Sequence, residues 1–183
     1  SWARRCVKET DEDPDKAKRK PIANLYRLAP NLSLTHLLSN ITVSNGIAFS
    51  ENENIMYFAD TPTGRIQKFE YTKNFNKFYE LEANMIFKNV GEPDGATVDK
   101  DNNYWSARVR GKCIICVDTK DETIIEKISL PTNTPTCVTF GGANLNSLYI
   151  TSLRADPTSD NEGGNLHKIE TSTKGRVQLL TDI

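Results

Sequence analysis

Two polar residues, Asn45 and Asp94, carry the side chains best suited to chemistry in this sequence of 183 residues. Each directly precedes a glycine at the start of a short apolar segment. An amide oxygen and a carboxylate that converge in a polar channel suit a hard cation such as Ca²⁺, and Mg²⁺ or Mn²⁺ less selectively. Asn-Gly and Pro-Asp-Gly are also ordinary turn sequences, so a purely structural role is the competing interpretation.

The elements that would position these two residues form a repeat. Residues 45–60 read as a polar turn, a short strand, a polar loop and an apolar strand, and the same order returns at 94–108 and at 137–152. A period of about 40 to 50 residues built from short strands is typical of a β-propeller. Asn45 and Asp94 stand in the same phase of consecutive repeats, so we expect both at one mouth of the central channel.

The repeat predicts an all-β chain that forms one partial propeller over residues 1–183, with somewhat under four blades. An incomplete blade at 1–44 is followed by blades at 45–90, 91–136 and 137–183. An incomplete ring leaves open sheet edges and uncovered blade faces. We therefore expect either that further blades precede this sequence in a longer protein, or that a second chain closes the ring; closure with four blades is the alternative.

The charged segment 8–21 lacks apolar periodicity and predicts a surface loop. The spacing of its aspartates imitates the start of an EF-hand loop. Lys16 stands where that loop requires glycine and Ile22 where it requires a bidentate glutamate, so an EF-hand is excluded. The segment is then either a solvated loop or a lid over a binding site.

Composition and cysteine spacing exclude several classes of protein. The 23 basic and 24 acidic residues nearly balance, so we expect no partner among nucleic acids or anionic membranes, and no apolar run approaches the roughly 20 residues that cross a bilayer. Cys113 and Cys116 have CxxC spacing within an apolar strand, where residues three apart face opposite sides. They are expected to be buried, inert thiols rather than a metal or redox pair. Two histidines are too few for a histidine zinc site.

Several segments together resemble the SMP-30/regucalcin family, which includes gluconolactonases and luciferin-regenerating enzymes. The segments that carry the resemblance are 44–50, 57–61, 93–95 with Asp99 and Trp105, 149–154 and 162–164. The resemblance covers nearly the whole chain, in the family's order and spacing. It implies a six-bladed propeller with one divalent metal ion in the channel, Ca²⁺ first and Mn²⁺, Mg²⁺ or Zn²⁺ as alternatives, and hydrolysis of a lactone. It also implies a cytoplasmic protein, although glycosylation sequons at Asn31 and Asn40 leave secretion open.

Site residues follow from matching positions in this resemblance. Asn45 and Asp94 match metal ligands, and Asp94 is also the candidate catalytic residue that orients or deprotonates water. Glu9 and Arg154 match positions near the substrate. A third metal ligand, a glutamate of the family's first blade, has no counterpart in this sequence, nor do the family's substrate-orienting arginine and asparagine.

Other positions have competing roles. The side chains of Tyr104 and Trp105 are expected to pack between blades rather than stack on substrate. For Asp60 and Arg154, hydrogen bonding at a strand end or ion pairing is at least as strongly expected as a direct role. Arg108 and Arg110 replace a more glycine-rich turn, which implies a basic channel mouth that favours an acidic sugar or another anion.

The function that these inferences favour is hydrolysis of a small sugar lactone, with the carbonyl polarised by the bound cation. Hydrolysis of an organophosphate or another ester on the same scaffold is the alternative within enzymes, because fold does not determine substrate. A non-catalytic propeller that binds a divalent metal, or a fragment without activity, is the alternative outside enzymes.

Overall fold

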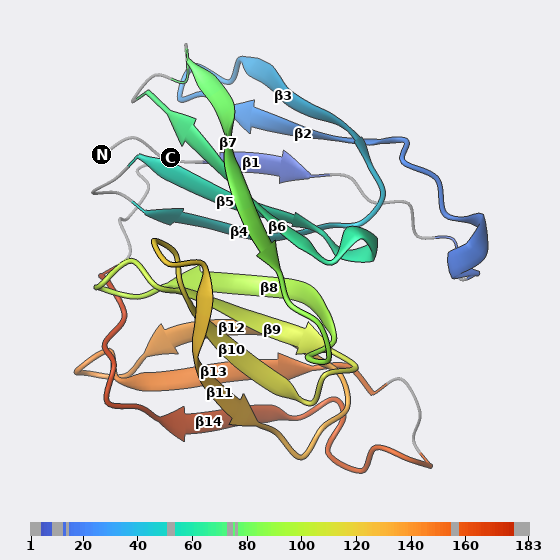
Figure 1. Cartoon of the computed structure of the whole chain (residues 1–183), viewed down its shortest axis with the longest axis vertical. Helices are drawn as coiled ribbons and strands as arrows, with labels where there is room; N and C mark the ends of the chain where they lie inside the picture. The colour runs from blue at the N-terminus through green and yellow to red at the C-terminus, as the bar shows by residue number, and fades with distance from the viewer. Residues whose placement is uncertain are drawn as a thin grey trace.

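The described part of the chain is built almost entirely from short β-strands (Figure 1). The computed structural model describes residues 5–8 (backbone only), 13, 15–50, 54–72, 75, 77–154 and 158–177. Its helices are the single-turn 3-10 helices η1 (Lys16–Lys18) and η2 (Thr61–Thr63). Neither has the length or the apolar character that crossing a membrane requires, and the described residues contain no other helix.

The strands form four antiparallel sheets in which neighbours along the chain are hydrogen-bonded. The first sheet contains β1 (Arg5–Lys8), β2 (Ala23–Leu28) and β3 (Leu34–Ile41). The second contains β4 (Ser44–Ser50), β5 (Ile55–Asp60), β6 (Arg65–Tyr71) and β7 (Phe78–Ile86). The third contains β8 (Glu92–Val98), β9 (Tyr104–Val109), β10 (Cys113–Asp118) and β11 (Thr123–Ser129). The fourth contains β12 (Pro135–Gly141), β13 (Ser147–Ser152) and β14 (Leu166–Glu170).

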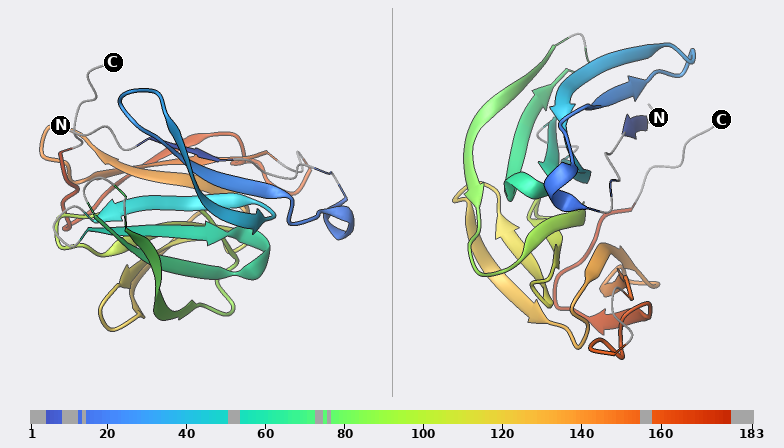
Figure 2. Two further views of the ribbon diagram at one scale, coloured as in Figure 1. Left: turned by 90° about the horizontal axis from the view of Figure 1, so that it is seen from above. Right: turned by 90° about the vertical axis from the view of Figure 1, so that its right-hand side faces the viewer.

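The sheets stack face to face around an arc, as the right panel of Figure 2 shows. An apolar cluster fills each of the three interfaces between consecutive sheets. In β5, Met56 and Phe58 face the first sheet, whereas Tyr57 and Ala59 face the third. This alternation explains why β5 is apolar at consecutive positions: both of its faces are covered.

The CxxC pair and the aromatic pair of β9 lie in these interfaces. Cys113 belongs to the cluster between the second and third sheets, and Cys116 to the cluster between the third and fourth. Tyr104 and Trp105 are fully buried on the same two opposite sides. The predictions of buried thiols and of packing aromatics are therefore confirmed.

The innermost strands β4, β8 and β12 run in the same direction and begin at the same end of the molecule (Figure 1). Consecutive members of this set contact one another. The opposite end is tied by the segment after β14, because Lys100 N donates to Lys174 O at 3.0 Å and Gly175 N donates to Leu145 O at 2.7 Å. The inner strands thus pack against one another, and the hydrogen bonds of Lys174 and Gly175 connect the segment after β14 to the loops that follow β8 and β12.

Candidate functional site

A cavity of about 450 Å³ lies at the starting ends of the inner strands. Both Asn45 of β4 and Asp94 of β8 line it. The repeat phase predicted that these two side chains meet at one mouth, and the cavity contains both. Thr134 and Thr136, at the start of the fourth sheet, contribute further oxygen atoms to its wall.

Neither candidate ligand lies in a hairpin turn, which was the competing interpretation. Both are within strands, and the pairing register shifts between Asn45 and Ala48 in β4 and between Pro93 and Ala96 in β8. Such irregularities redirect side chains from the regular alternation of a strand. The two residues therefore stand at comparable irregularities of neighbouring inner strands, and both residues line the cavity.

The glycine that follows each candidate ligand is required for a different reason at each of the two positions. Gly46 has a φ of +64°, and its carbonyl accepts a hydrogen bond of 2.8 Å from the Tyr104 hydroxyl. Gly95 needs no unusual φ, but a Cβ at this position would lie 2.6 Å from the Sγ atom of Cys137. Backbone freedom explains the first glycine, whereas close approach of β8 and β12 explains the second.

A hydroxyl between the two strands links the candidate ligands. Asn45 Nδ2 donates to Thr61 Oγ1 at 2.9 Å, and Thr61 Oγ1 donates to the carbonyl oxygen of Pro93 at 2.8 Å. Pro93 is the residue before Asp94, so this chain fixes the Asn45 amide relative to the Asp94 backbone. Thr61 is the first residue of η2, which Gly64 ends in the left-handed conformation.

The charges around the cavity differ from those inferred from the sequence. Arg108 is fully buried and donates to Gly91 O at 2.7 Å, and burial lowers its pKa. Arg110 forms an ion pair with Glu92. The expectation that these two arginines make the mouth basic is therefore wrong for Arg108. The basic side chains that line the cavity are Lys16 and Arg19, from the segment that was predicted to be either a solvated loop or a lid.

The remaining predicted residues lie apart from this cavity or outside the described residues. Glu9 is among the latter. Arg154 is exposed and is not among the described residues that line the cavity, whereas its neighbour Leu153 is. Asp60 has a structural role, since its carboxylate accepts from the backbone nitrogens of Thr42 and Val43 at 3.0 and 2.7 Å.

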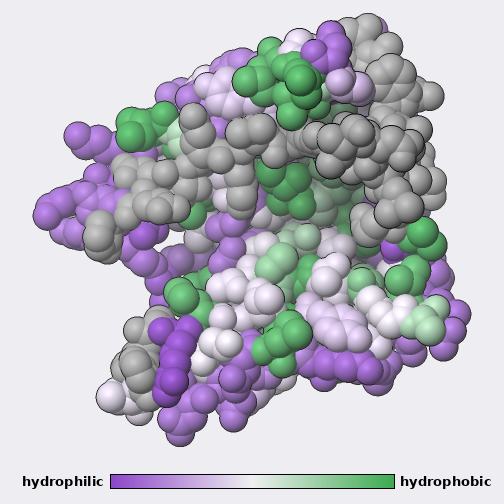
Figure 3. All heavy atoms as spheres, turned by 180° about the vertical axis from the view of Figure 1, so that it is seen from behind, coloured by the Kyte–Doolittle hydropathy of each residue, from purple (hydrophilic) through white to green (hydrophobic). Residues whose placement is uncertain are grey.

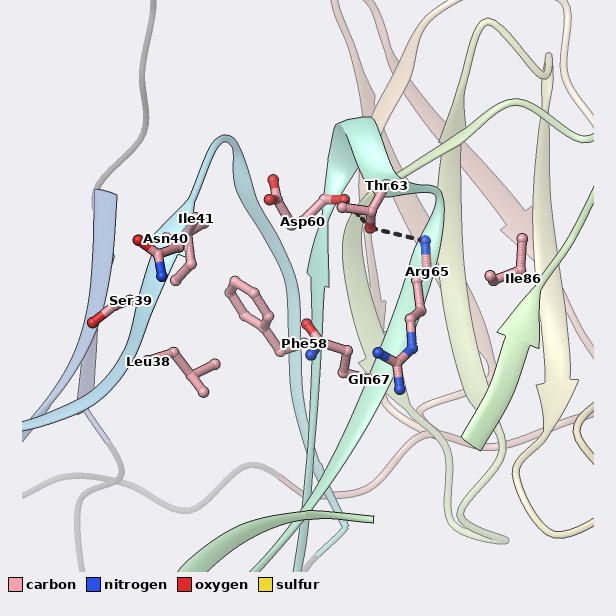
Figure 4. A pocket seen from close by; sticks show the side chains of 10 residues that line it. All are labelled: Leu38, Ser39, Asn40, Ile41, Phe58, Asp60, Thr63, Arg65, Gln67 and Ile86. Atoms are coloured by element: carbon pink, nitrogen blue, oxygen red, sulfur yellow. Dashed lines mark hydrogen bonds between the residues drawn. The ribbon is translucent and has the colours of Figure 1, made fainter. Parts of the chain in front are cut away.

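A second cavity of about 470 Å³ lies between the first and second sheets (Figure 4). Figure 4 shows the Asp60 carboxylate directed toward the strand that carries Ile41 and away from Arg65. Arg65 forms an ion pair of 2.7 Å with Glu80, which also accepts from Gln67 at 3.0 Å. The charged side chains that line the second cavity, Asp60 and Arg65, thus both bind other groups of the protein. The first cavity is therefore the better candidate site.

The donor set of the first cavity fits a hard divalent cation in type. Asn45 and Asp94 offer an amide oxygen and a carboxylate, which are ligands that Ca²⁺ prefers. Within the described residues, no three His, Cys, Asp or Glu side chains are grouped closely enough to hold a metal ion. Asn45 and Asp94 are the two candidate ligands, whereas Glu92, which also lines the cavity, is paired with Arg110. Two residues supply fewer ligand atoms than the six to eight oxygens that surround Ca²⁺ in proteins.

Several proteins of known or assigned function are similar to this chain in sequence. A 6-deoxy-6-sulfogluconolactonase of Pseudomonas putida is 33% identical over 68% of this chain and 43% of its own length. A pentonolactonase of Haloferax volcanii is 27% identical over 87% and 58%, and regucalcin of Danio rerio is 28% identical over 71% and 44%. The chain spans about half the length of these curated relatives.

Two solved structures share the fold. A luciferin-regenerating enzyme matches 94% of this chain and 63% of its own, with a TM-score of 0.78 and 25% identity. Regucalcin of Agrobacterium tumefaciens, described as a calcium-binding protein, matches 92% and 59%, with a TM-score of 0.79 and 25% identity. The model of the SMP-30/Gluconolactonase/LRE-like region matches residues 6–154, and the chain belongs to this family.

Proposed function

We propose that this chain provides the cation site and part of the substrate cavity of a hydrolase for a small sugar lactone. The observation that carries the proposal is the shared cavity of Asn45 and Asp94, linked through Thr61. The lactonases among its relatives support the substrate class. The calcium-binding structural neighbour supports a divalent ion, with Ca²⁺ proposed first. We further propose that additional strands complete a six-bladed ring, because the four described sheets form an open arc.

Each residue has a defined part in the proposed reaction. A bound divalent cation supplies Lewis-acid polarisation of the lactone carbonyl. Asn45 and Asp94 would hold that cation, and Thr61 keeps the Asn45 amide in place. The Asp94 carboxylate orients the attacking water or takes its proton. The water oxygen bonds to the carbonyl carbon, the ring C–O bond breaks, and the ring oxygen leaves with a proton as the hydroxyl of an open hydroxy acid.

The proposal is tested by hydrolysis of D-glucono-1,5-lactone, followed by acid release with the spontaneous rate subtracted. Chelator-treated protein should be inactive, and Ca²⁺, Mn²⁺, Mg²⁺ or Zn²⁺ should restore turnover. Asp94→Asn should lose at least about 100-fold in rate, because it removes the negative charge of one ligand and the base that takes the proton of water. Asp101→Asn is the matched control: Asp101 is exposed on the loop after β8, at the far end from the cavity, where it pairs with Lys100.

Two results would contradict this function. Turnover that persists in chelator, or in Asp94→Asn, would remove the cation or the carboxylate from the reaction. Cation binding without any turnover would instead support a non-catalytic metal-binding protein, at least for this chain alone.

A further inference from the structure

We propose that the cavity selects lactones that carry a carboxylate at the end remote from the reacting ester, and that Lys16 and Arg19 recognise this group. The inference rests on the proposed function and adds a substrate class to it. Both side chains come from the loop around η1, and both line the cavity that contains Asn45 and Asp94. In Figure 1, η1 lies at the end of the molecule where β8 begins, and the contact of Lys16 with Glu92 places this segment near the start of that strand.

Arg19 is held in place while its terminal nitrogens stay available. Its Nε atom donates to the backbone carbonyl of Asp13 at 2.8 Å, which fixes the direction of the side chain, and the residue is partly buried. Among the described residues, no carboxylate forms an ion pair with it. The two Nη groups of a guanidinium form a planar pair that matches the two oxygens of a carboxylate.

Lys16 forms only a weak ion pair, so its ammonium group can also bind a ligand. Asp15 caps the short helix, because Ala17 N donates to Asp15 Oδ1 at 3.1 Å, and this positions Lys16. The Lys16 ammonium lies 3.9 Å from Glu92 Oε2, the same oxygen that pairs closely with Arg110. A half-exposed contact of this length contributes little, so Lys16 remains a second cation at the cavity.

The wall of the cavity therefore combines two kinds of chemistry. The inner strands bring Asn45 and Asp94, where we propose the cation and the lactone carbonyl. The loop brings two positive side chains, and Figure 3 shows the loop as a hydrophilic projection on the left of the molecule. In the second cavity the cation Arg65 is already paired with Glu80, so that cavity offers no comparable group for an anion.

The test uses two lactones that differ at one carbon. D-glucaro-1,4-lactone carries a carboxylate where D-glucono-1,4-lactone carries a hydroxymethyl group. Binding to the full chain is measured by calorimetry in low salt, and hydrolysis of both compounds is followed separately on the same samples. The variants are Lys16→Gln, Arg19→Gln and the control Lys18→Gln, which removes a cation from the same helix but one that pairs with Asp15 outside the cavity.

The wild type should bind the glucaro-lactone at least about 10-fold more tightly than the glucono-lactone. Arg19→Gln should lose about 10-fold for the anionic compound and less than about 2-fold for the neutral one, with a smaller selective loss in Lys16→Gln and none in Lys18→Gln. Unchanged affinity for the neutral compound shows that the loop has kept its structure.

Each contrary outcome points to a different claim. Equal affinity for the two lactones, or equal losses for both in Arg19→Gln, would overturn the carboxylate inference and leave the proposed hydrolysis intact. Selective binding of the anionic compound without turnover of either would sustain the recognition by Lys16 and Arg19 and contradict the proposed hydrolysis. Absence of binding by both would overturn both.

Discussion

The Thr61 hydroxyl accepts a hydrogen bond of 2.9 Å from the side-chain amide of Asn45 and donates one of 2.8 Å to the carbonyl oxygen of Pro93. Thr61 follows the end of β5, so one side chain of the second sheet spans to the third. It thereby ties a candidate ligand on β4 to the backbone beside the candidate ligand on β8. Mutation of groups that orient metal ligands in this way typically lowers metal affinity by about 10- to 100-fold.

Removal of this hydroxyl should weaken cation binding without unfolding the protein. Thr61→Val keeps the size of the side chain, and we expect Ca²⁺ affinity to fall by about 10-fold or more. Thr61→Ser retains the hydroxyl and should bind Ca²⁺ almost as the wild type does. Thr63→Val is the control, because Thr63 lies in the same short helix and bonds to Asp60 O instead. Equal Ca²⁺ affinity in all three variants would show that Thr61 does not position the site.

The contact between Gly95 and Cys137 should limit the stability of the inner strands. A Cβ at position 95 would lie 2.6 Å from Cys137 Sγ and 2.8 Å from its Cα, so β8 and β12 would have to move apart. Gly95→Ala should cost about 1 to 3 kcal/mol of unfolding free energy, measured by urea denaturation. Adding Cys137→Ala relieves the contact with sulfur but not the contact with the backbone, so it should restore only part of the loss. A fully stable Gly95→Ala protein would contradict this packing.

Thiol reactivity should distinguish the described cysteines. Cys137 is exposed, whereas Cys113 and Cys116 are buried, and burial raises the pKa of both buried thiols. With Cys6 replaced by serine, the native protein should release one equivalent of thionitrobenzoate rapidly and the other two only after unfolding. The further change Cys137→Ser should abolish the rapid phase. Two or three rapid equivalents would show that the CxxC pair is accessible.

The same burial should make stability fall at alkaline pH. The unfolded thiol ionises near its ordinary pKa of 9.0, whereas the folded Cys116 resists ionisation because its pKa is raised. Its contribution is complete below pH 9 and is lost as the pH rises above that value. Cys116 should account for a loss of roughly 1 kcal/mol between pH 9 and 10, and Cys116→Ala should show a correspondingly shallower dependence. Identical pH dependence in the two proteins would contradict the raised pKa.

Local pattern was sufficient to predict most of the strands and to place the two candidate ligands at one end of neighbouring strands, where both line one cavity. The repeat placed Asn45 and Asp94 at equivalent points, and the alternation in 113–118 separated Cys113 from Cys116. These inferences depend only on the period of a strand and on the order of strands in a sheet, and both properties are local.

The contacts between sheets could not be predicted in the same way. Thr61 was not among the predicted site residues, because its partners lie 16 and 32 positions away. Arg108 was expected at the mouth, yet strand alternation directs it into the interface with the second sheet, on the same face as Tyr104. Lys16 reaches the cavity because its segment lies near the start of β8, which is distant in the sequence. Each case depends on long-range packing that periodicity does not encode.

The central claim is that Asn45 and Asp94 hold a divalent cation, and calorimetric titration of Ca²⁺ into metal-free protein tests it most directly. The titration is made on the wild type, Asp94→Ala and the control Asp101→Ala, with folding of each checked by circular dichroism. We predict one site in the wild type and in Asp101→Ala, and a loss of at least about 100-fold in affinity in Asp94→Ala. Equal binding by folded Asp94→Ala, or none by folded wild type, would contradict the claim.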